Sequence, residues 1–269
     1  MYKKSVFVLV LNTSISTSAL ALQQVSVPDG AFKMGCSATD SKCEKDEGQA
    51  GGISVNVPAF KIDKYEVTVA NYKKCMAAGK CKKPKDHQRN KYCNLGAKGR
   101  ENHPINCIDW QDAQTYCQWR GARLPYEAEW EKAARAGSTT AYPWGNTVSC
   151  KQAILDDGVT QGSVKGEPDG CGEDRTWSVG SRPPNALGLY DMHGNAGEWV
   201  SNWYGKNALA ENYAKGDLKG PASGKQKVVR GGSWDENIAN LRSSFRNVKP
   251  PVSGDTIYGS IGFRCVSEK

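Results

Sequence analysis

Residues 228–247, VVRGGSWDENIANLRSSFRN, and residues 254–265, GDTIYGSIGFRC, are the most informative part of this 269-residue chain. These residues are rich in glycine, tryptophan, arginine and asparagine, a composition typical of a binding or catalytic loop. The segments VVRGGSW and SIGFRCV are predicted to be short strands on either side of this loop. No cysteine lies between Cys171 and Cys265, and none of the three histidines, His87, His103 and His193, falls within it. Any function here must therefore rest on shape, hydrogen bonding and charge, or on a group supplied from elsewhere.

The rest of the chain contains no low-complexity run, charge block or long Ser/Pro stretch that would mark a linker. We therefore expect one domain over residues 22–269. The chain has 29 glycines, and only about three of its segments have helical periodicity. This combination predicts a loop-rich α+β fold that is held by turns rather than a layered sheet with many helices.

The N-terminal residues 1–21, MYKKSVFVLVLNTSISTSALA, are typical of a secretory signal peptide. Two lysines form a basic start, an apolar core follows, and Ala19-Leu20-Ala21 is a small-x-small site for cleavage after Ala21. The alternative is a buried N-terminal strand, whereas a membrane span would need about 20 apolar residues. We therefore expect an exported protein, either periplasmic or secreted. Because no cysteine stands at the cleavage point, we expect no lipid anchor.

Ten cysteines agree with export, since an even count in a secreted chain usually means disulfide bonds. Short-range bonds would each close one loop, in the pairs Cys36/Cys43, Cys75/Cys81, Cys93/Cys107 and Cys150/Cys171. These pairs leave Cys117 and Cys265, whose bond would tie the last strand to a central helix. The alternatives are a zinc site, which no C-x-x-C pair supports, and free catalytic thiols, against which the even count argues.

The formal net charge is +8, or +6 once the two lysines of the signal peptide are subtracted. Much of the excess lies between Lys73 and Lys91, where Tyr72 and Tyr92 are the flanking aromatic residues. A nucleic-acid surface is one interpretation of such a segment, but a solvated cationic face explains this composition better. We therefore expect no nucleic-acid partner.

The mature sequence begins with VSVPDGAFKMGCS, residues 25–37, whose alternation predicts two short strands joined by the turn Pro28-Asp29-Gly30. We expect these two strands to form a hairpin. The following ISVNVPAFKIDKYEVT, residues 53–68, alternates again. Thr68 is placed to N-cap a helix that stops at Gly79.

Two further helices are predicted. Asp109 precedes WQDAQTYCQWRG, a helix that buries Cys117 and ends at Gly121. The segment RLPYEAEWEKAARAG begins at Pro125 and ends before Gly137, with acidic residues early and basic residues late, as the helix dipole favours. Its apolar stripe, expected to face the core, consists of Tyr126, Trp130, Ala133 and Ala134. In the second half of the chain turn residues recur so often that loops are expected to dominate.

Five segments in order resemble the formylglycine-generating enzyme, or sulfatase-modifying factor, domain family. They are HPINCIDWQDAQTYCQWRGARLPYEAEWEKAARAG (103–137), YPWGN (142–146), LGLYDMHGNAGEWVSNWY (187–204), VVRGGSW (228–234) and IGFRC (261–265). The resemblance runs from about Val25 to Val266. It implies a loop-rich variant of the C-type-lectin fold and a bond between Cys117 and Cys265.

The resemblance also implies where a copper site would lie. Active oxidases of this family convert a peptide cysteine to formylglycine with oxygen and a copper ion held by two cysteines soon after the GGS-aromatic motif. Aligned on that motif, this chain has Glu236 and Leu241 at those two positions. Since Cu(I) selects sulfur ligands, copper is not expected here.

A calcium loop is the second metal feature that the resemblance implies. Family members bind calcium through side-chain and carbonyl oxygens of a loop that corresponds to HGNAGE, in which the ligands would be Gly194, Asn195, Ala196 and Glu198. Calcium takes 6 to 8 oxygen ligands, and a tight loop brings such donors together. The alternative is a plain turn in which Glu198 pairs with an arginine.

We interpret the loop after VVRGGSW as a recognition surface of an accessory protein for a peptide, protein or glycan. It combines an aromatic anchor with charged and amide groups, supplied by Trp234, Asp235, Glu236, Asn237, Asn240, Arg242 and Arg246. The alternative for the two arginines is that they satisfy buried carbonyls or acids such as Glu198.

An enzymatic function is the competing hypothesis, either formylglycine-type oxidation with other ligands or another oxidoreductase reaction in natural-product maturation. Glu236 is the candidate catalytic residue, because burial beside Trp234 would raise its pKa and make it a general base. Plain loop polarity is the alternative for Glu236 and its neighbours Asp235 and Asn237, and it is the interpretation we favour. The sequence leaves the choice between binding protein and enzyme open.

Overall fold

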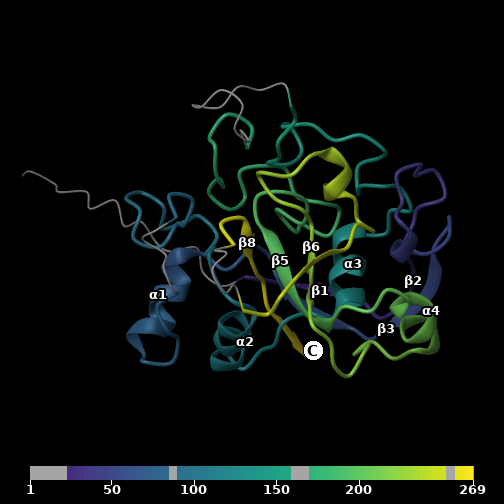
Figure 1. Ribbon diagram of the computed structural model, residues 1–269, viewed down its shortest axis with the longest axis horizontal. Coiled ribbons are helices and arrows are strands. Elements are labelled where there is room, and N and C mark those ends of the chain that lie inside the picture. The colour runs from purple at the N-terminus through teal and green to yellow at the C-terminus, as the bar shows by residue number, and fades with distance from the viewer. Residues whose placement is uncertain (1–22, 85–89, 159–169, 253–257, 269) are drawn as a thin grey trace, which may run out of the picture.

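The computed structural model describes residues 23–84, 90–158, 170–252 and 258–268 (Figure 1). The predicted signal peptide, residues 1–21, and part of the lysine-rich segment, residues 85–89, lie outside the described residues. Within these ranges no helix has the length and hydrophobicity to span a membrane.

The first predicted hairpin is wrong. Strand β1 (Gln24–Val27) pairs with β4 (Phe60–Asp63) and not with β2, and β9 (Val266–Glu268) completes this antiparallel sheet. Strand β2 (Gly30–Met34) pairs with β3 (Ile53–Val57) in a sheet of its own. Gly30, with a φ of 122°, redirects the chain between the two sheets. Alternation indicates that a segment is a strand, but it does not select the partner strand.

A third sheet carries the C-terminal loop at one end. Its strand order is β7 (Asn247–Lys249), β6 (Lys227–Arg230), β5 (Gly197–Trp203) and β8 (Ile261–Gly262), and β5 runs parallel to β8. The sequence did not predict β5. Most of its residues are buried on both faces, so the segment lacks the alternation that identifies half-exposed strands.

The three predicted helices are confirmed as α1 (Val69–Ala77), α2 (Trp110–Trp119) and α3 (Glu127–Arg135). The hydroxyl of Thr68 accepts a hydrogen bond from the Asn71 amide and caps α1, whereas Asp109 makes no side-chain cap at α2. Shorter elements are α4 (Ala208–Glu211) and the 3-10 turns η1 (Lys45–Glu47), η2 (Tyr213–Lys215) and η3 (Ile238–Leu241).

Helix α3 lies between β2 and the third sheet in Figure 1, and its predicted apolar stripe is buried. Trp130, Ala133 and Ala134 are fully enclosed and pack with residues of β2, β3 and β4 such as Met34. Tyr126 is only partly buried. A second apolar cluster lies beneath α1 and α2. The predicted loop-rich mixed α and β fold is thereby confirmed.

All ten cysteines form disulfide bonds, in the five expected pairs. The structure joins Cys36–Cys43, Cys75–Cys81, Cys93–Cys107, Cys117–Cys265 and Cys150–Cys171. The bond between Cys117 and Cys265 spans 148 residues and fastens α2 to the segment before β9. None of these five disulfide bonds involves a residue of the loop that follows β6.

Candidate functional site

The GGSW loop, residues 231–246, leaves the end of β6 through two glycines in left-handed backbone conformations. Gly231 has a φ of 93° and Gly232 a φ of 67°. A Cβ atom on Gly232 would lie 2.7 Å from both the Asn240 carbonyl oxygen and a methyl group of Leu241. Only glycine therefore allows the loop to fold this closely over η3.

Trp234, the expected aromatic anchor for a ligand, points into the protein. Only 2% of it is exposed, and its ring centroid lies 4.9 Å from that of Tyr92. Its backbone N–H donates to the carbonyl oxygen of Asn195 at 3.0 Å. The indole Nε1 is buried without a hydrogen-bond partner among the described residues. The tryptophan thus fixes the loop to its neighbours and leaves one buried donor unsatisfied.

Arg242 and Arg246 bind carboxylates inside the protein. Two nitrogens of Arg242 each lie 2.6 Å from an oxygen of Glu47, and those of Arg246 lie 2.7 and 2.9 Å from Glu127. Burial tends to lower the pKa of both guanidinium groups, but these carboxylates outweigh it, so both pKa values are raised. Pairing with buried acids was the alternative role expected for these arginines. The structure shows this pairing, but the partners are Glu47 and Glu127 and not Glu198.

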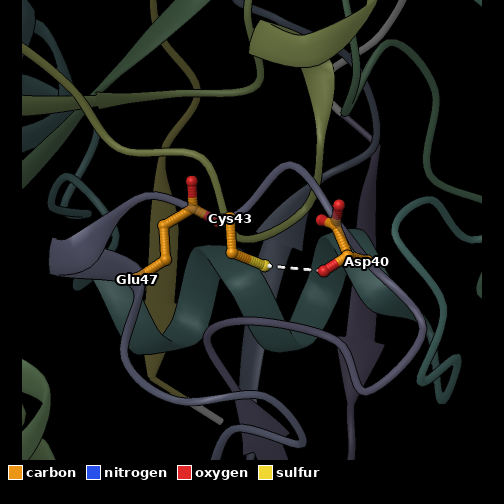
Figure 2. A group of neighbouring side chains, drawn as sticks. All are labelled: Asp40, Cys43 and Glu47. Atoms are coloured by element: carbon orange, nitrogen blue, oxygen red, sulfur yellow. Dashed lines mark hydrogen bonds between the residues drawn. The ribbon is translucent and has the colours of Figure 1, made fainter.

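Arg242 also neutralises an acidic cluster on the N-terminal loop. Figure 2 shows Asp40, Cys43 and Glu47, whose oxygen and sulfur atoms lie within 4.8 Å of one another. A metal ion does not explain this cluster, because Cys43 is bonded to Cys36 and Arg242 contacts both carboxylates. The cluster therefore anchors the GGSW loop to the N-terminal part of the fold.

The remaining loop residues that the sequence singled out are polar and at least partly accessible. Asn237 caps η3, its Oδ1 accepting from the Ala239 amide at 2.9 Å, and Asp235 accepts from the Ser233 hydroxyl at 2.6 Å. Asn240 is half-buried on η3. The predicted set therefore divides between internal anchors and groups that a ligand can reach.

A cavity of about 580 Å³ lies beside η3. Asn237, Ile238 and Arg242 form one wall, and 42% of Ile238 is exposed. The other walls come from three separate segments, through Thr39, Asp40, Ser41, Lys42, Ala141, Tyr142, Asn146, Asp156, Asp157 and Gly158. Sequence reasoning missed these residues: YPWGN and DDG signalled turns, but no local pattern places such turns next to one another.

Glu236 is held firmly, yet one of its two carboxylate oxygens accepts no hydrogen bond from the described residues. Its Oε1 accepts from Nδ2 of Asn247 at 2.8 Å, and its backbone carbonyl accepts from the Asp156 amide at 3.1 Å. Its Oε2 is buried without a hydrogen-bond partner in the described part of the chain. Burial first, and then the charge of Asp235, raise the pKa of Glu236 to about 7, against the opposing effects of Lys249 and Asn247.

The comparisons with known proteins agree with this architecture. The model of the sulfatase-modifying factor enzyme 1-like domain matches residues 13–269. The chain belongs to this family. It is 31% identical to the formylglycine-generating enzyme of Mus musculus over 290 residues, covering 91% of this chain and 75% of that protein.

Other family relatives differ in their described activity. The chain is 27% identical to the inactive C-alpha-formylglycine-generating enzyme 2 of Bos taurus, covering 91% of this chain and 88% of that one. The solved structure of PvdO from Pseudomonas aeruginosa is 28% identical with a TM-score of 0.71, covering 91% of this chain and 94% of that one. Membership in the family therefore does not by itself decide whether this chain is an oxidase.

The two positions that correspond to the family's copper ligands do not fit that metal. Glu236 offers a carboxylate and Leu241 no donor, and every cysteine of the chain is in a disulfide. Leu241 is fully buried, and its carbonyl accepts a hydrogen bond from Nδ1 of His193 at 2.7 Å. Burial lowers the pKa of His193 to about 4, so this imidazole is neutral near pH 7. The position has become part of the core.

The family's calcium loop here comprises Gly194, Asn195, Ala196 and Glu198. Both oxygens of the buried Glu198 carboxylate accept from Arg264 at 2.6 to 2.8 Å, and Oε2 also accepts from the Trp130 indole at 2.8 Å. Oδ1 of Asn195 accepts from the Trp177 amide at 2.8 Å. These side-chain oxygens already accept hydrogen bonds, which argues against Asn195 and Glu198 as calcium ligands, and calcium binding by this loop stays a prediction.

Proposed function

We propose that this chain is an exported family member that acts without copper-dependent oxidation, as an accessory protein that binds a peptide, protein or glycan. The observation that carries this proposal is the pairing of all ten cysteines in disulfides, which leaves no thiolate for Cu(I). Five disulfides also suit an oxidising compartment and so support export.

The cavity beside η3 is the binding site in this proposal. It lies on the loop that the sequence singled out, and it combines the exposed aliphatic surface of Ile238 with polar groups from separate segments. Its volume of about 580 Å³ lies within the range of ligand pockets. A rigid scaffold with accessible loop side chains is where binding functions commonly reside.

The charges of the cavity favour a positively charged peptide. Asp40, Asp156 and Asp157 line it together with Lys42. Arg242 contacts both Asp40 and Glu47, so its charge is balanced within the wall, and Asp156 and Asp157 remain as acidic groups beside the basic Lys42. The cavity is therefore locally acidic on a chain whose formal net charge is +8, and a peptide with a lysine side chain complements it.

Binding and metal content test this proposal together. The purified protein is titrated with the peptide acetyl-Gly-Lys-Gly-amide, with its glutamine counterpart and with a neutral trisaccharide, while metals are quantified by mass spectrometry. We expect the lysine peptide to bind best, and Ile238→Lys, which places a positive charge in the acidic cavity, to weaken binding at least 10-fold. Val252→Lys is the matched control, because Val252 is 54% exposed and does not line the cavity.

Two results would overturn the proposal. One is stoichiometric copper together with oxygen consumption in the presence of a cysteine peptide, which would restore the oxidoreductase alternative. The other is a failure of all three ligands to bind, or equal binding of the lysine peptide by the wild-type protein and Ile238→Lys.

A further inference from the structure

A second cavity lies between β2 and the end of α3, and none of its lining residues lines the cavity beside η3. Its volume of about 490 Å³ is within the range of ligand pockets. Phe32 and Leu187 are partly buried side chains that pack against the core and also line this cavity. Four more residues complete an apolar wall, namely Val27, Pro28, Ala31 and Ala136. The cavity can therefore cover an aliphatic group.

The charged groups of this β2–α3 cavity are mainly basic. Lys33, Lys132 and Arg135 line it, and Asp29 is the acid among its described lining residues. Glu131 pairs with Arg135 at 2.8 Å, whereas neither lysine forms an ion pair within the described part of the chain. Two uncompensated ammonium groups therefore face one carboxylate, and the cavity favours an anion.

Lys132 is held in place by groups that do not cancel its charge. Its Nζ donates to the carbonyl oxygens of Pro28 at 2.7 Å, Gly30 at 2.8 Å and Val57 at 3.3 Å. Burial lowers the pKa of Lys132, and the opposing effect of Asp29 is smaller. The ammonium is thus incompletely hydrated, and an anion beside it would stabilise its charged form.

Few hydrogen-bonding groups in this wall remain for a ligand. The Ser138 hydroxyl lies 2.6 Å from the Thr140 hydroxyl and accepts from the Thr140 amide at 3.1 Å. The three protons of Lys132 are directed at carbonyl oxygens. A ligand with several peptide groups would leave some of them without partners, which is unfavourable, whereas a ligand with one polar end would not.

We propose that the β2–α3 cavity binds a free aliphatic carboxylate. The alkyl chain lies on the apolar wall around Phe32 and Leu187, and the carboxylate lies beside the exposed Lys33 and the fixed charge of Lys132. This site is separate from the proposed peptide site and does not depend on it.

Calorimetry on the full chain at pH 7 tests the ligand class. The probes are sodium octanoate, sodium butyrate, octylamine hydrochloride and the peptide acetyl-Gly-Gly-Leu with a free carboxylate. We expect octanoate to bind at least about 10-fold more tightly than butyrate, because each fully buried methylene contributes roughly 4-fold. Octylamine has the same chain with the opposite charge and should bind more weakly than octanoate.

Charge reversal at Lys33 tests the location. Lys33→Glu should weaken octanoate binding by about 10-fold, because losing an exposed attraction and adding a repulsion each change affinity roughly 3-fold. The same variant should strengthen octylamine binding. Lys61→Glu is the matched control, because Lys61 is an exposed lysine on β4 that does not line the cavity. Ile238→Lys should leave octanoate binding unchanged, since Ile238 lines the other cavity.

Four results would overturn the inference. Octanoate does not bind, or it binds no better than octylamine. Lys33→Glu and Lys61→Glu have the same effect on both ligands. The peptide binds more tightly than octanoate, which would assign the cavity to a polypeptide terminus. Ile238→Lys changes octanoate binding, which would place octanoate beside η3.

Discussion

Replacing Arg242 by alanine should destabilise the protein strongly, because this residue ties the GGSW loop to the N-terminal loop. Only 2% of Arg242 is exposed, and its guanidinium group contacts Glu47 at 2.6 Å through two nitrogens and Asp40 at 3.0 Å. Its Nε also donates to the Ala239 carbonyl in η3 at 2.8 Å. Replacing this side chain by alanine therefore removes all of its contacts with the two carboxylates and with η3.

The expected cost follows from what the substitution leaves behind. Glu47 is fully buried and, among the described residues, would keep only the hydrogen bonds from the Ser244 hydroxyl and the Glu44 amide. Removing one partner of a buried ion pair costs about 3–5 kcal/mol, because the remaining charge is left uncompensated. For a domain of this size each 1 kcal/mol lowers Tm by roughly 2–4 °C. We therefore expect a decrease in Tm on the order of 10 °C.

Urea denaturation followed by tryptophan fluorescence measures this change in the free energy of unfolding. The control is Arg175→Ala, since Arg175 and Glu173 form an exposed pair at 3.1 Å and such pairs contribute about 0–1 kcal/mol. The reasoning fails if Arg242→Ala unfolds within about 1 kcal/mol of the wild type.

Three further predictions concern the disulfides, the carboxyl groups and calcium. Cys117→Ala/Cys265→Ala should lower the free energy of unfolding in urea by about 5 kcal/mol, and Cys75→Ala/Cys81→Ala by about 2 kcal/mol, because the stabilisation grows with the size of the closed loop; equal losses would contradict this account. The folded state raises the pKa of Glu236 from 4.5 to about 7, so its contribution is fully present below pH 4.5 and is lost as pH rises through 7. Glu236→Gln should show a smaller loss than the wild type in a series of melting curves, because Asp191, whose pKa burial raises to about 6, also titrates in this range. Addition of millimolar calcium, or of EDTA, should leave Tm unchanged, because Glu198 is paired with Arg264; a rise in Tm with calcium would restore the family's metal site.

Local signals in the sequence predicted much of the scaffold but little of the site. Thr68 and Gly79 delimit α1 as expected, because capping depends on residues within one turn of the helix. The hairpin failed because the choice of partner strand depends on distant residues, as in the register of Val25 with Ile62. The cavity could not be predicted either, since Asp40 and Asp156 are far apart in the chain and meet only in the folded protein.

The two positions that depart from the copper pattern have different surroundings, and this difference constrains how the chain can function. Leu241 is fully buried in an apolar cluster with Ala141, Tyr142 and Leu155. A cysteine at this position would be smaller than leucine, so apolar contacts in the cluster would be lost. Glu236 instead keeps a carboxylate oxygen that accepts no hydrogen bond from the described residues, a cost that an apolar or small residue would avoid. One position is therefore part of the apolar core, whereas the other keeps a carboxylate that the described residues satisfy at Oε1 and not at Oε2.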